Sequence, residues 1–383
     1  MRNLKKEFIN FLNSSFPVAT LHARGIAKGD ILLSYMKLPF MGKILPYFYG
    51  SSNYWQSYQI AKIWRDYGYN VDIINHDNDE FIPDKEYKIF IDIHTNMERI
   101  SPLLSENCIK ILHITGAHWA FQNKAELERI AALKERRGVL LKPRRLQQPN
   151  NALEIADCAT ILGNEFTQNT YKFANKPLYP LPNNAIVEYQ QFKNKNFEKC
   201  RNNYFWFGNG GLIHKGLDLV LEAFLEMPDY HLTICGPIKF EKDFESEYYD
   251  ELYHTSNITT QTNDWIDVRS RKFMEILINC VGLIYPSCSE GQSGSVIQCM
   301  HGGLIPLISY QCGIDVNGFG VVLKDNSIDA ICDEMYNLSC LRCEQLREMS
   351  KKSWECARIN YGKKAFINKY AHFAKDIVDN ISD

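Results

Sequence analysis

The chain has 383 residues, of which 45% are hydrophobic and 23% are charged, and its formal net charge is −2. A single hydrophobic core stops growing at roughly 250–300 residues, so this length predicts two domains with a cleft between them. The near-neutral charge argues against a nucleic-acid backbone as the main partner. The sequence contains no apolar run near the ~20 residues that a membrane-spanning helix needs.

The first half of the chain alternates short apolar, β-rich runs with longer helical stretches, a pattern typical of a parallel sheet wound with helices on both faces. Between the first two expected strands, Tyr54–Tyr67 has helical spacing, Gly68 is a plausible C-terminal cap, and Ser52 or Asn53 is suited to cap the start. The expected strands are Ile31–Met36, Val71–Asn75, Ile89–Ile93, Ile109–Thr115 and Thr160–Gly163.

Three prolines, Pro177, Pro180 and Pro182, followed by Asn183 and Asn184, interrupt this pattern and predict a hinge. Beyond a polar linker the alternation restarts, and a helical stretch closes the chain. The second set of expected strands is Tyr204–Phe207, His231–Cys235, Ile258–Thr260, Val281–Tyr285, Leu304–Ile308 and Val321–Leu323. The predicted fold class is α/β, with two doubly wound Rossmann-like domains facing a cleft. We place them at residues 1–185 and 186–350, with helices over 351–383 that pack back toward the first domain.

A turn rich in Gly and Ser follows the expected strand Val281–Tyr285 and leads into a helix. Small residues there leave backbone N–H groups free to point at an anion, and the positive end of the helix adds to their attraction, so the turn is suited to a diphosphate. Glu290 lies at its mouth, where a carboxylate could orient sugar hydroxyls. Gln298, about two helical turns further on, could reach a ribose hydroxyl. Such turns are common at helix starts, and a purely structural role is the alternative.

A second loop, Gly208–Gly216, again runs from a strand through glycines to a cation and into a helix. Glycines let the backbone approach a ligand closely, and Lys215 could neutralise the phosphate charge that builds on a leaving group. Each loop is weak support alone, because a lysine is often only a solvated surface charge. Two such loops at strand ends of one domain favour a phosphate site, and we expect both to cradle a single pyrophosphate.

With these motifs the chain resembles the retaining glycosyltransferases of family 4 (glycosyl transferases group 1) of the bacterial surface-polysaccharide type, which have the GT-B fold. The resemblance rests on Pro182–Asn184, Lys215–Asp218, Cys235–Pro237 and the block from Tyr285 to Ser309. It implies an acceptor-binding first domain and a donor-binding second domain. It also implies that Lys215 binds the diphosphate and Glu290 contacts the transferred sugar.

In the same comparison Gln298 stands where the family places a ribose-binding Glu, and Trp265–Asp267 match the segment that lines the base. The implied donor-binding residues are Gly210, Gly211, Lys215, Trp265, Ile266, Glu290, Gly291, Ser293, Gly294, Ser295 and Gln298. The sequence departs from the family at two points. An amide replaces the ribose-binding carboxylate and lacks its charge. The family's loop carries an Arg ahead of the Lys, whereas Asn209–Gly211 occupy that stretch here, so one phosphate cation comes from elsewhere or is absent.

On the acceptor side, two histidines follow expected strands, and His118 matches a family position near the sugar. A neutral imidazole at His118 or His94 could bind a sugar hydroxyl or help the acceptor lose its proton, whereas satisfying loop backbone groups is the alternative for both. Asn53 and Tyr54 are secondary candidates, because the loop before them faces the acceptor in the family; their alternative is helix capping.

A basic run within residues 134–145 is a further acceptor candidate. It holds six cations and one acid, so it could bind the phosphates of a lipid-linked acceptor or an anionic membrane surface. A solvated helix end is the alternative. The cations are Lys134, Arg136, Arg137, Lys142, Arg144 and Arg145, of which we take Arg144 and Arg145 as acceptor-binding.

Location follows from cysteine usage and the N-terminal residues. Twelve scattered cysteines indicate reduced thiols and a cytoplasmic protein. Cys340 and Cys343 form one C-x-x-C, but a zinc site needs a second ligand pair. Residues 1–15 mix basic and apolar side chains at helical spacing, compatible with peripheral contact on the inner face of the cell membrane or with an ordinary docked helix.

The expected function is hexosyl transfer with retention from a nucleotide diphosphate-sugar to a glycan or lipid-linked acceptor, in cell-surface polysaccharide (capsule or lipopolysaccharide) synthesis. The expected catalytic residues are Glu290, Lys215 and His118. We expect no cofactor and no essential metal, because the nearest D-x-D, Asp77–Asp79, lies in a polar loop. Two alternatives stay open, a nucleotide-sugar 2-epimerase of the same fold and a non-catalytic GT-B partner subunit.

Overall fold

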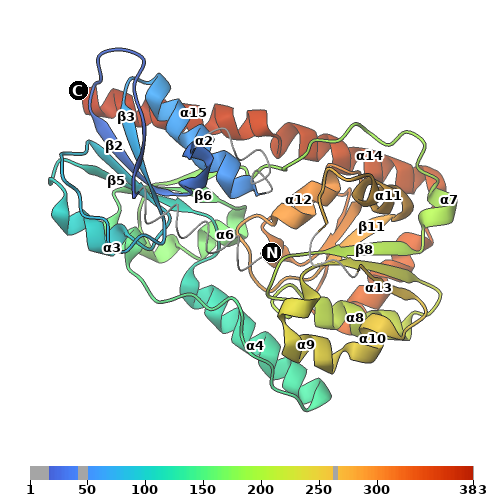
Figure 1. Cartoon of the computed structure of the whole chain (residues 1–383). Coiled ribbons are helices and arrows are strands. Elements are labelled where there is room, and N and C mark those ends of the chain that lie inside the picture. The colour runs from blue at the N-terminus through green and yellow to red at the C-terminus, as the bar shows by residue number, and fades with distance from the viewer. Residues whose placement is uncertain (1–16, 42–50, 262–265, 383) are drawn as a thin grey trace.

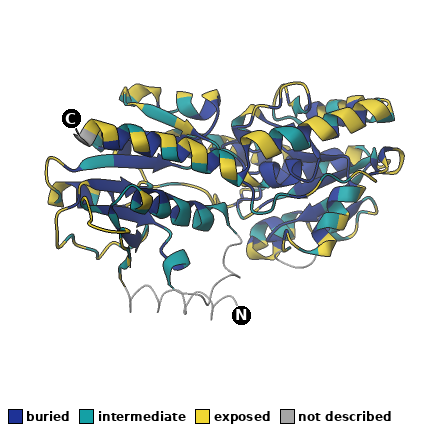
Figure 2. Cartoon of the chain, turned by 90° about the horizontal axis from the view of Figure 1, so that it is seen from above, coloured by how far each residue is buried: buried dark blue, intermediate teal, exposed yellow. Residues whose placement is uncertain are grey.

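The computed structural model describes residues 17–41, 51–261 and 266–382. Two α/β domains lie side by side, and the last two helices lead from the second domain, where α14 (Cys343–Asn360) lies, to the first, where α15 (Lys363–Ser382) lies (Figure 1). The helix expected within residues 1–15 lies outside the described residues. Seen from above, the strands of both sheets are buried and the outer faces of the covering helices are exposed (Figure 2).

The first domain is built on a seven-stranded sheet with the order β1-β3-β2-β4-β5-β6-β7. Every neighbouring pair is parallel except β1 and β3. The inner strands are apolar along their whole length because both faces of a parallel sheet are covered by helices. The strands are β1 Ala19–Leu21, β2 Asp30–Tyr35, β3 Asn70–Asn75, β4 Ile89–Asp92, β5 Ile109–Ile114, β6 Cys158–Leu162 and β7 Leu178–Leu181.

Two details of the first domain differ from the sequence-based expectation. The proline-rich stretch does not end the sheet, because Leu178–Leu181 forms β7, where an edge position tolerates the missing N–H of Pro180. The N-cap of α2 (Ser52–Asp66) is Ser51, whose hydroxyl accepts a hydrogen bond from the Asn53 N–H, and both expected caps lie inside the helix.

The second domain has a six-stranded, wholly parallel sheet with the order β10-β9-β8-β11-β12-β13. This is the doubly wound order, in which the chain reverses its direction of winding between the two central strands, here β8 and β11. The loops that follow these two strands therefore turn toward opposite faces of the sheet, and a crevice lies between them. The strands are β8 Asn203–Phe207, β9 His231–Cys235, β10 Ile258–Thr260, β11 Gly282–Tyr285, β12 Ile305–Ile308 and β13 Val321–Val322.

Helices cover both faces of this second sheet, with α8 and α13 packed together on one side and α12 and α14 on the other (Figure 1). The described α-helices, besides α2, are α3 Met97–Ile100, α4 Trp119–Arg137, α5 Ala152–Ile155, α6 Glu165–Asn169, α7 Phe197–Cys200, α8 Leu217–Glu226, α9 Lys242–Glu247, α10 Tyr249–Tyr253, α11 Arg271–Asn279, α12 Gly294–Met300, α13 Ile328–Ser339, α14 Cys343–Asn360 and α15 Lys363–Ser382. Among these described helices, none is long and apolar enough to cross a membrane.

The chain returns to the first domain at the start of α15. Helix α14 packs against α12 and β12 of the second domain, whereas α15 packs against α2 and β7 of the first. Phe366, Tyr370 and Phe373 are buried in the core of the first domain, where the Tyr370 hydroxyl accepts a hydrogen bond from the indole N–H of Trp64 at 3.2 Å. The last helix is therefore an integral part of the first domain.

All twelve cysteines are free thiols, most of them buried in the two cores. The thiol of Cys343 donates a hydrogen bond to the carboxylate of Glu198, and Cys340 is exposed. The C-x-x-C motif thus makes no disulfide in this structure.

Candidate active site

The two small-residue turns of the second domain meet in space. The ammonium of Lys215, from the loop after β8, lies 2.7 Å from the carboxylate of Glu290, from the turn after β11. Both side chains are largely buried, with exposed fractions of 7% and 16%. The sheet order explains the contact, because β8 and β11 are the central strands at which the winding reverses. The expected convergence of the two loops is thus present.

The Glu290 carboxylate is held by three neighbours. Besides Lys215, it accepts hydrogen bonds from the hydroxyls of Ser287 at 3.1 Å and Tyr285 at 3.4 Å. Burial alone would raise the pKa of Glu290, but the charge and hydrogen bond of Lys215 outweigh burial and lower it. Burial likewise disfavours charge on Lys215, yet the facing carboxylate raises its pKa. Each partner therefore keeps the other ionised.

His214 connects the same two loops by hydrogen bonds and carries no charge. Its Nε2–H donates to the carbonyl of Ser289 at 2.6 Å, and its own carbonyl accepts from the Cys288 N–H at 2.9 Å. Burial, together with the nearby Lys215 cation, lowers the pKa of His214 to about 3. The imidazole is therefore neutral at physiological pH, and it fixes the relative position of the loops.

The Gly-rich loop uses part of its backbone internally. The N–H groups of Gly211 and Leu212 donate to the two carboxylate oxygens of Glu241, at 2.5 and 3.2 Å. Gly211 has φ of +87°, a conformation that favours glycine. The structure thus satisfies the Gly211 amide with a side chain of the same domain, and no ligand is needed to pair it.

Arg145 of the first domain approaches this loop from the opposite side of the cleft. A Cβ on Gly211 would lie 2.6 Å from Arg145 Cγ, so the arginine stem passes directly over that glycine. Its positive charge contributes to the lowered pKa of Glu290. The guanidinium has no hydrogen bond or ion pair with any residue in the described part of the chain, and Arg145 is exposed. Arg145 therefore places a positive charge beside Asn209–Gly211, the stretch where the family's loop carries an Arg and this chain does not.

The backbone of Arg145 is anchored from helix α4. Its N–H donates to both carboxylate oxygens of Glu126 at 3.0 Å, and its carbonyl accepts from the side-chain amide of Gln122. Glu126 also accepts from the N–H of Arg144 at 2.8 Å. These contacts fix where the Arg145 side chain starts and leave its guanidinium free, an arrangement suited to a ligand contact.

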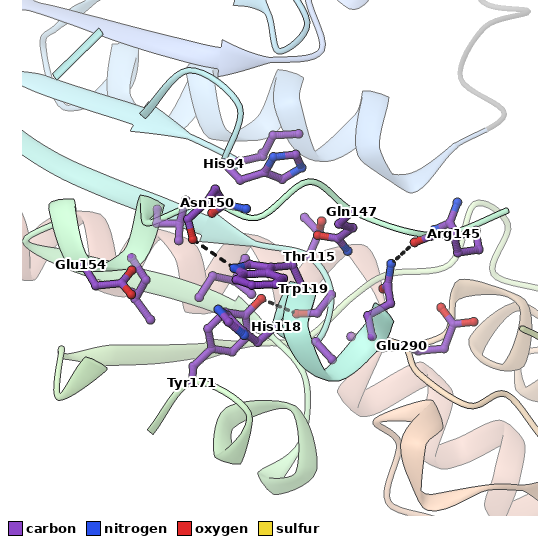
Figure 3. A pocket seen from close by; sticks show the side chains of 18 residues that line it. His94, Thr115, His118, Trp119, Arg145, Gln147, Asn150, Glu154, Tyr171 and Glu290 are labelled. Carbon is purple, nitrogen blue, oxygen red and sulfur yellow. Dashed lines mark hydrogen bonds between the residues drawn. The ribbon is translucent and has the colours of Figure 1, made fainter. Parts of the chain in front are cut away.

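A pocket of about 110 Å³ opens from this point into the first domain. Its walls are the ends of β4 and β5, the start of α4, and the extended segment 145–150, and Glu290 and Gly291 close it from the second domain. Figure 3 shows Glu290 at one end and Glu154 at the other, with the Trp119 ring between them. The pocket lining combines hydrogen-bonding groups with an aromatic face.

The two predicted histidines both line this pocket. His118 is the N-cap of α4, where its Nδ1 accepts from the Ala120 N–H at 3.4 Å. Burial lowers the pKa of His118, which keeps the imidazole neutral and able to accept this bond. His94 follows β4 and has φ of +155°, a strained backbone for a non-glycine residue. Buried Asp92 holds that strained turn by accepting from the His94 N–H at 3.1 Å.

Other predicted residues lie elsewhere. Asn53 and Tyr54 lie in the first turn of α2 and are not among the pocket walls. Trp265 lies outside the described residues, and Ile266 packs against the core of the second domain. Of the small residues at the start of α12, Ser293 is buried and makes no side-chain cap, whereas Gly294 and Ser295 are accessible.

Gln298 is occupied by the chain that links the domains. Its Oε1 accepts from the N–H groups of Ile186 and Val187 at 3.0 and 3.1 Å, and its Nε2 donates to the Val187 carbonyl at 2.9 Å. The side chain is buried, at 2% exposure. This pairing needs both a donor and an acceptor, so it explains an amide at a position where a carboxylate could not make all three bonds.

The basic run is not a free positive patch. Arg136 pairs with Asp218 and Glu222 of α8 at 2.8 and 3.0 Å, and Arg137 pairs with Glu247 and Glu251 at 2.8 and 2.7 Å. Helix α4 reaches from the first domain to the second to make these contacts (Figure 1). Acids of the other domain therefore pair with these two cations, and binding of the run to a membrane or an acceptor stays a prediction.

Arg144 belongs to the same set of contacts, since its guanidinium pairs with Asp243. Arg144 thus makes an interdomain ion pair, and its assignment to the acceptor stays a prediction. The run of acids Asp243, Glu247 and Glu251, spaced by four residues, was a signal in the sequence for a basic partner helix.

Arg129 is a further residue that the sequence reading missed. It is 6% exposed, and its guanidinium donates to the Pro286 carbonyl at 3.0 Å. A Cβ on Gly216 would lie 3.0 Å from the same guanidinium. Arg129 thus reaches from α4 to the end of one active-site loop at Gly216 and to the start of the other at Pro286. A lone arginine within a helical pattern gives no such signal in a sequence.

The comparisons with known proteins rest on shape. No protein-family model matches the chain, and no curated protein sequence matches it. Among solved structures, sucrose-phosphate synthase from Thermosynechococcus elongatus is similar with a TM-score of 0.63 and 10% identity, over 92% of this chain and 99% of that one.

Two further structures are similar at comparable levels. HepE from Anabaena, solved with UDP and glucose, has a TM-score of 0.57 and 10% identity, over 92% of this chain and all of that one. TarM from S. aureus, solved with fondaparinux, alpha-GlcNAc-glycerol and UDP, has a TM-score of 0.54 and 13% identity over 79% of this chain. The chain spans 59% of the TarM chain. These likenesses, together with two tandem doubly wound sheets, identify the architecture of the chain as the GT-B fold.

Proposed function

We propose that the chain is a glycosyltransferase that moves a sugar, with retention and without an essential metal, from a nucleotide diphosphate-sugar to a glycan or lipid-linked acceptor. The observation that carries this proposal is the buried Lys215–Glu290 pair at the crevice between β8 and β11, with the stem of Arg145 passing over Gly211 in the same loop as Lys215. A cation, a carboxylate and a second cation around one crevice suit a diphosphate joined to a sugar.

The ligands of the structural neighbours suggest the donor. HepE has been solved with UDP-glucose, and TarM with UDP. UDP-sugars are therefore the first donors to test on this chain. A surface glycan or a lipid-linked glycan as acceptor, in cell-surface polysaccharide synthesis, remains our proposal from the sequence resemblance.

In this mechanism Lys215 exchanges part of its bond with Glu290 for a phosphate oxygen of the donor. Arg145 approaches the same diphosphate from the first domain, so the two cations stabilise the charge that develops as the anomeric carbon–oxygen bond breaks. Glu290 then accepts hydrogen bonds from hydroxyls of the transferred sugar. The acceptor hydroxyl forms the new bond on the same face and passes its proton to the departing diphosphate.

The pocket at the end of β5 holds the acceptor in this proposal. The face of Trp119 can stack on a sugar ring, while Glu154, His118 and His94 offer groups that bind hydroxyls. Because Glu290 lies at the inner end of the same pocket, an acceptor there reaches the anomeric carbon of the donor. The closed contact between the domains excludes water and favours transfer over hydrolysis.

A thermal-shift panel of nucleotides and nucleotide-sugars tests the donor, and product analysis tests the reaction. We expect a UDP- or related nucleotide-sugar to raise the melting temperature, and EDTA to leave turnover unchanged. Sugar transferred to an acceptor supports the proposal, whereas an isomerised nucleotide-sugar indicates an epimerase. Full stabilisation of Lys215→Ala by the nucleotide, or full stabilisation of Glu290→Ala by the complete nucleotide-sugar, would contradict it.

Arg145→Ala tests the cation from the opposite domain. We expect kcat/KM to fall by roughly 10²-fold with an unchanged melting temperature, because the side chain is exposed and its backbone anchors remain. Lys142→Ala is the matched control, since it removes an exposed cation from the same segment that is not in the wall of the pocket containing Glu290. Equal activity of Arg145→Ala and Lys142→Ala would remove Arg145 from the mechanism.

A further inference from the structure

A second cavity lies in the second domain, away from the cleft. It measures about 240 Å³ and is enclosed by the segment 191–197, the Gly302–Gly303 turn and helix α14. It shares no lining residue with the pocket that contains Glu290. Its volume exceeds by several-fold the ~30 Å³ that one water occupies in the liquid, so it has room for a small organic molecule.

Cations dominate the polar part of this lining. Lys193, Lys195, Arg347 and Lys351 all contribute to the wall, and no aspartate or glutamate of the described residues does. Within the described residues, Lys351 has an exposed partner in Glu355 at 3.7 Å, whereas Lys193 and Arg347 have no ion pair. Four positive groups around one hollow create a potential that attracts an anion.

Lys195 is the unusual member of the group, because it is buried at 6% exposure. Among the described residues its ammonium donates one hydrogen bond, to the Leu277 carbonyl at 3.0 Å, and has no carboxylate partner. The ring of Phe197 lies 5.8 Å away. A buried ammonium with two of its three N–H groups unpaired is costly unless an anion joins it. Burial accordingly lowers the pKa of Lys195 to about 8.

We propose that this cavity binds a small phosphate monoester, with the Lys195 ammonium as the buried countercharge and Arg347 and Lys351 closing over the phosphate from α14. A dianion of this class matches several cations and can use the two unpaired N–H groups. The apolar side chains of Phe192 and Trp354, also in the wall, accommodate the organic part.

Isothermal titration calorimetry with inorganic phosphate and glycerol 3-phosphate tests the site. Binding near pH 8 should take up a proton, because an anion beside Lys195 raises its pKa, and buffers of different ionisation enthalpy measure that uptake. We expect Lys195→Met to lose proton uptake and at least tenfold in affinity. Lys352→Met, on the same helix but outside the wall and paired with Glu348, should bind as the parent protein does.

The variants also separate this site from the cleft. Lys215→Ala should keep phosphate binding here even if the proposed transferase activity fails. Arg347→Gln combined with Lys351→Gln changes only the cavity rim, so it tests the site should Lys195→Met not fold. Two results would overturn the proposal. One is phosphate binding that is unchanged both in Lys195→Met and in the Arg347→Gln, Lys351→Gln double variant, and the other is loss of phosphate binding in Lys215→Ala.

Vesicles distinguish a free ester from a lipid headgroup as the source of the phosphate. Co-sedimentation with phosphatidic acid vesicles, lost in Lys195→Met and not seen with phosphatidylcholine vesicles, would assign a lipid phosphate. Binding of glycerol 3-phosphate without vesicle binding would assign a free ester. The site would be refuted if the protein bound neither inorganic phosphate nor glycerol 3-phosphate at millimolar ligand concentration, and bound neither kind of vesicle.

Discussion

The Lys215–Glu290 pair stabilises the protein only as a pair, because either charge left alone is buried without a counterion. We expect Lys215→Met or Glu290→Gln alone to cost about 3–5 kcal/mol of unfolding free energy, and the double variant to recover part of that loss. Urea unfolding of the three variants measures the coupling. Simple additivity of the single costs would show that the pair does not interact.

Acid should act on the same pair. The folded pKa of Glu290 lies below its ordinary value of 4.5, so the stabilisation from its carboxylate is present above that value and lost as pH falls through the folded pKa.

Lys195 also makes stability rise with pH, but in an alkaline range and because its ammonium is destabilised by burial. Its pKa is about 8 in the folded protein and 10.5 ordinarily, so the unfolded chain binds more protons between these values. Unfolding free energy should therefore rise from pH 8 to pH 10.5, by about 3 kcal/mol from this group alone. Urea unfolding across this range should show a flatter profile for Lys195→Met than for the parent protein. Equal slopes for the two proteins would mean that Lys195 titrates normally.

At the scale of elements, α4 connects the domains by ion pairs that lie partly in water. Removing one of its arginines should loosen the closed arrangement, and salt should weaken all of them. We expect Arg137→Ala, which loses Glu247 and Glu251, to increase the radius of gyration in small-angle X-ray scattering at low salt.

Helix α4 also provides the control for this measurement. Lys124 pairs only with Glu128 of the same helix among the described residues, so Lys124→Ala removes a cation without touching the other domain. The radius of gyration of Lys124→Ala should match that of the parent protein. An unchanged value for Arg137→Ala as well would show that these ion pairs do not hold the closed state.

The segment between the domains depends on α12 through Gln298. In Gln298→Glu an acceptor oxygen would face the Val187 carbonyl in place of a donor, so we expect a loss of about 1–3 kcal/mol in urea unfolding. Gln292→Glu is the matched control, because among the described residues the Gln292 side chain bonds only through its acceptor oxygen, toward the Asn183 N–H. Tighter nucleotide binding by Gln298→Glu without loss of stability would favour the ribose role inferred from the family.

At the scale of the whole molecule, both sheets and both active-site loops were predictable from the sequence. Parallel strands buried on two faces must be apolar throughout, and loops at strand ends of one doubly wound domain must share an edge. The short strand β1 and the strand β7, which contains Pro180, lacked those signals. The positions of Arg129 and Arg145 could not be derived, because they depend on how one domain docks against the other.

The connections between the domains also determine how they can move. The chain crosses twice, near Ala185 and at Gly362, and the crossings lie side by side: the Ala185 N–H donates to the Tyr361 carbonyl, and the Lys363 N–H to Glu188. The two connecting segments lie next to each other and form one hinge at one edge of the contact between the domains. Helix α4 lies at the opposite edge of that contact (Figure 1). The protein should therefore open like a clamshell, with the arginines of α4 separating furthest and first.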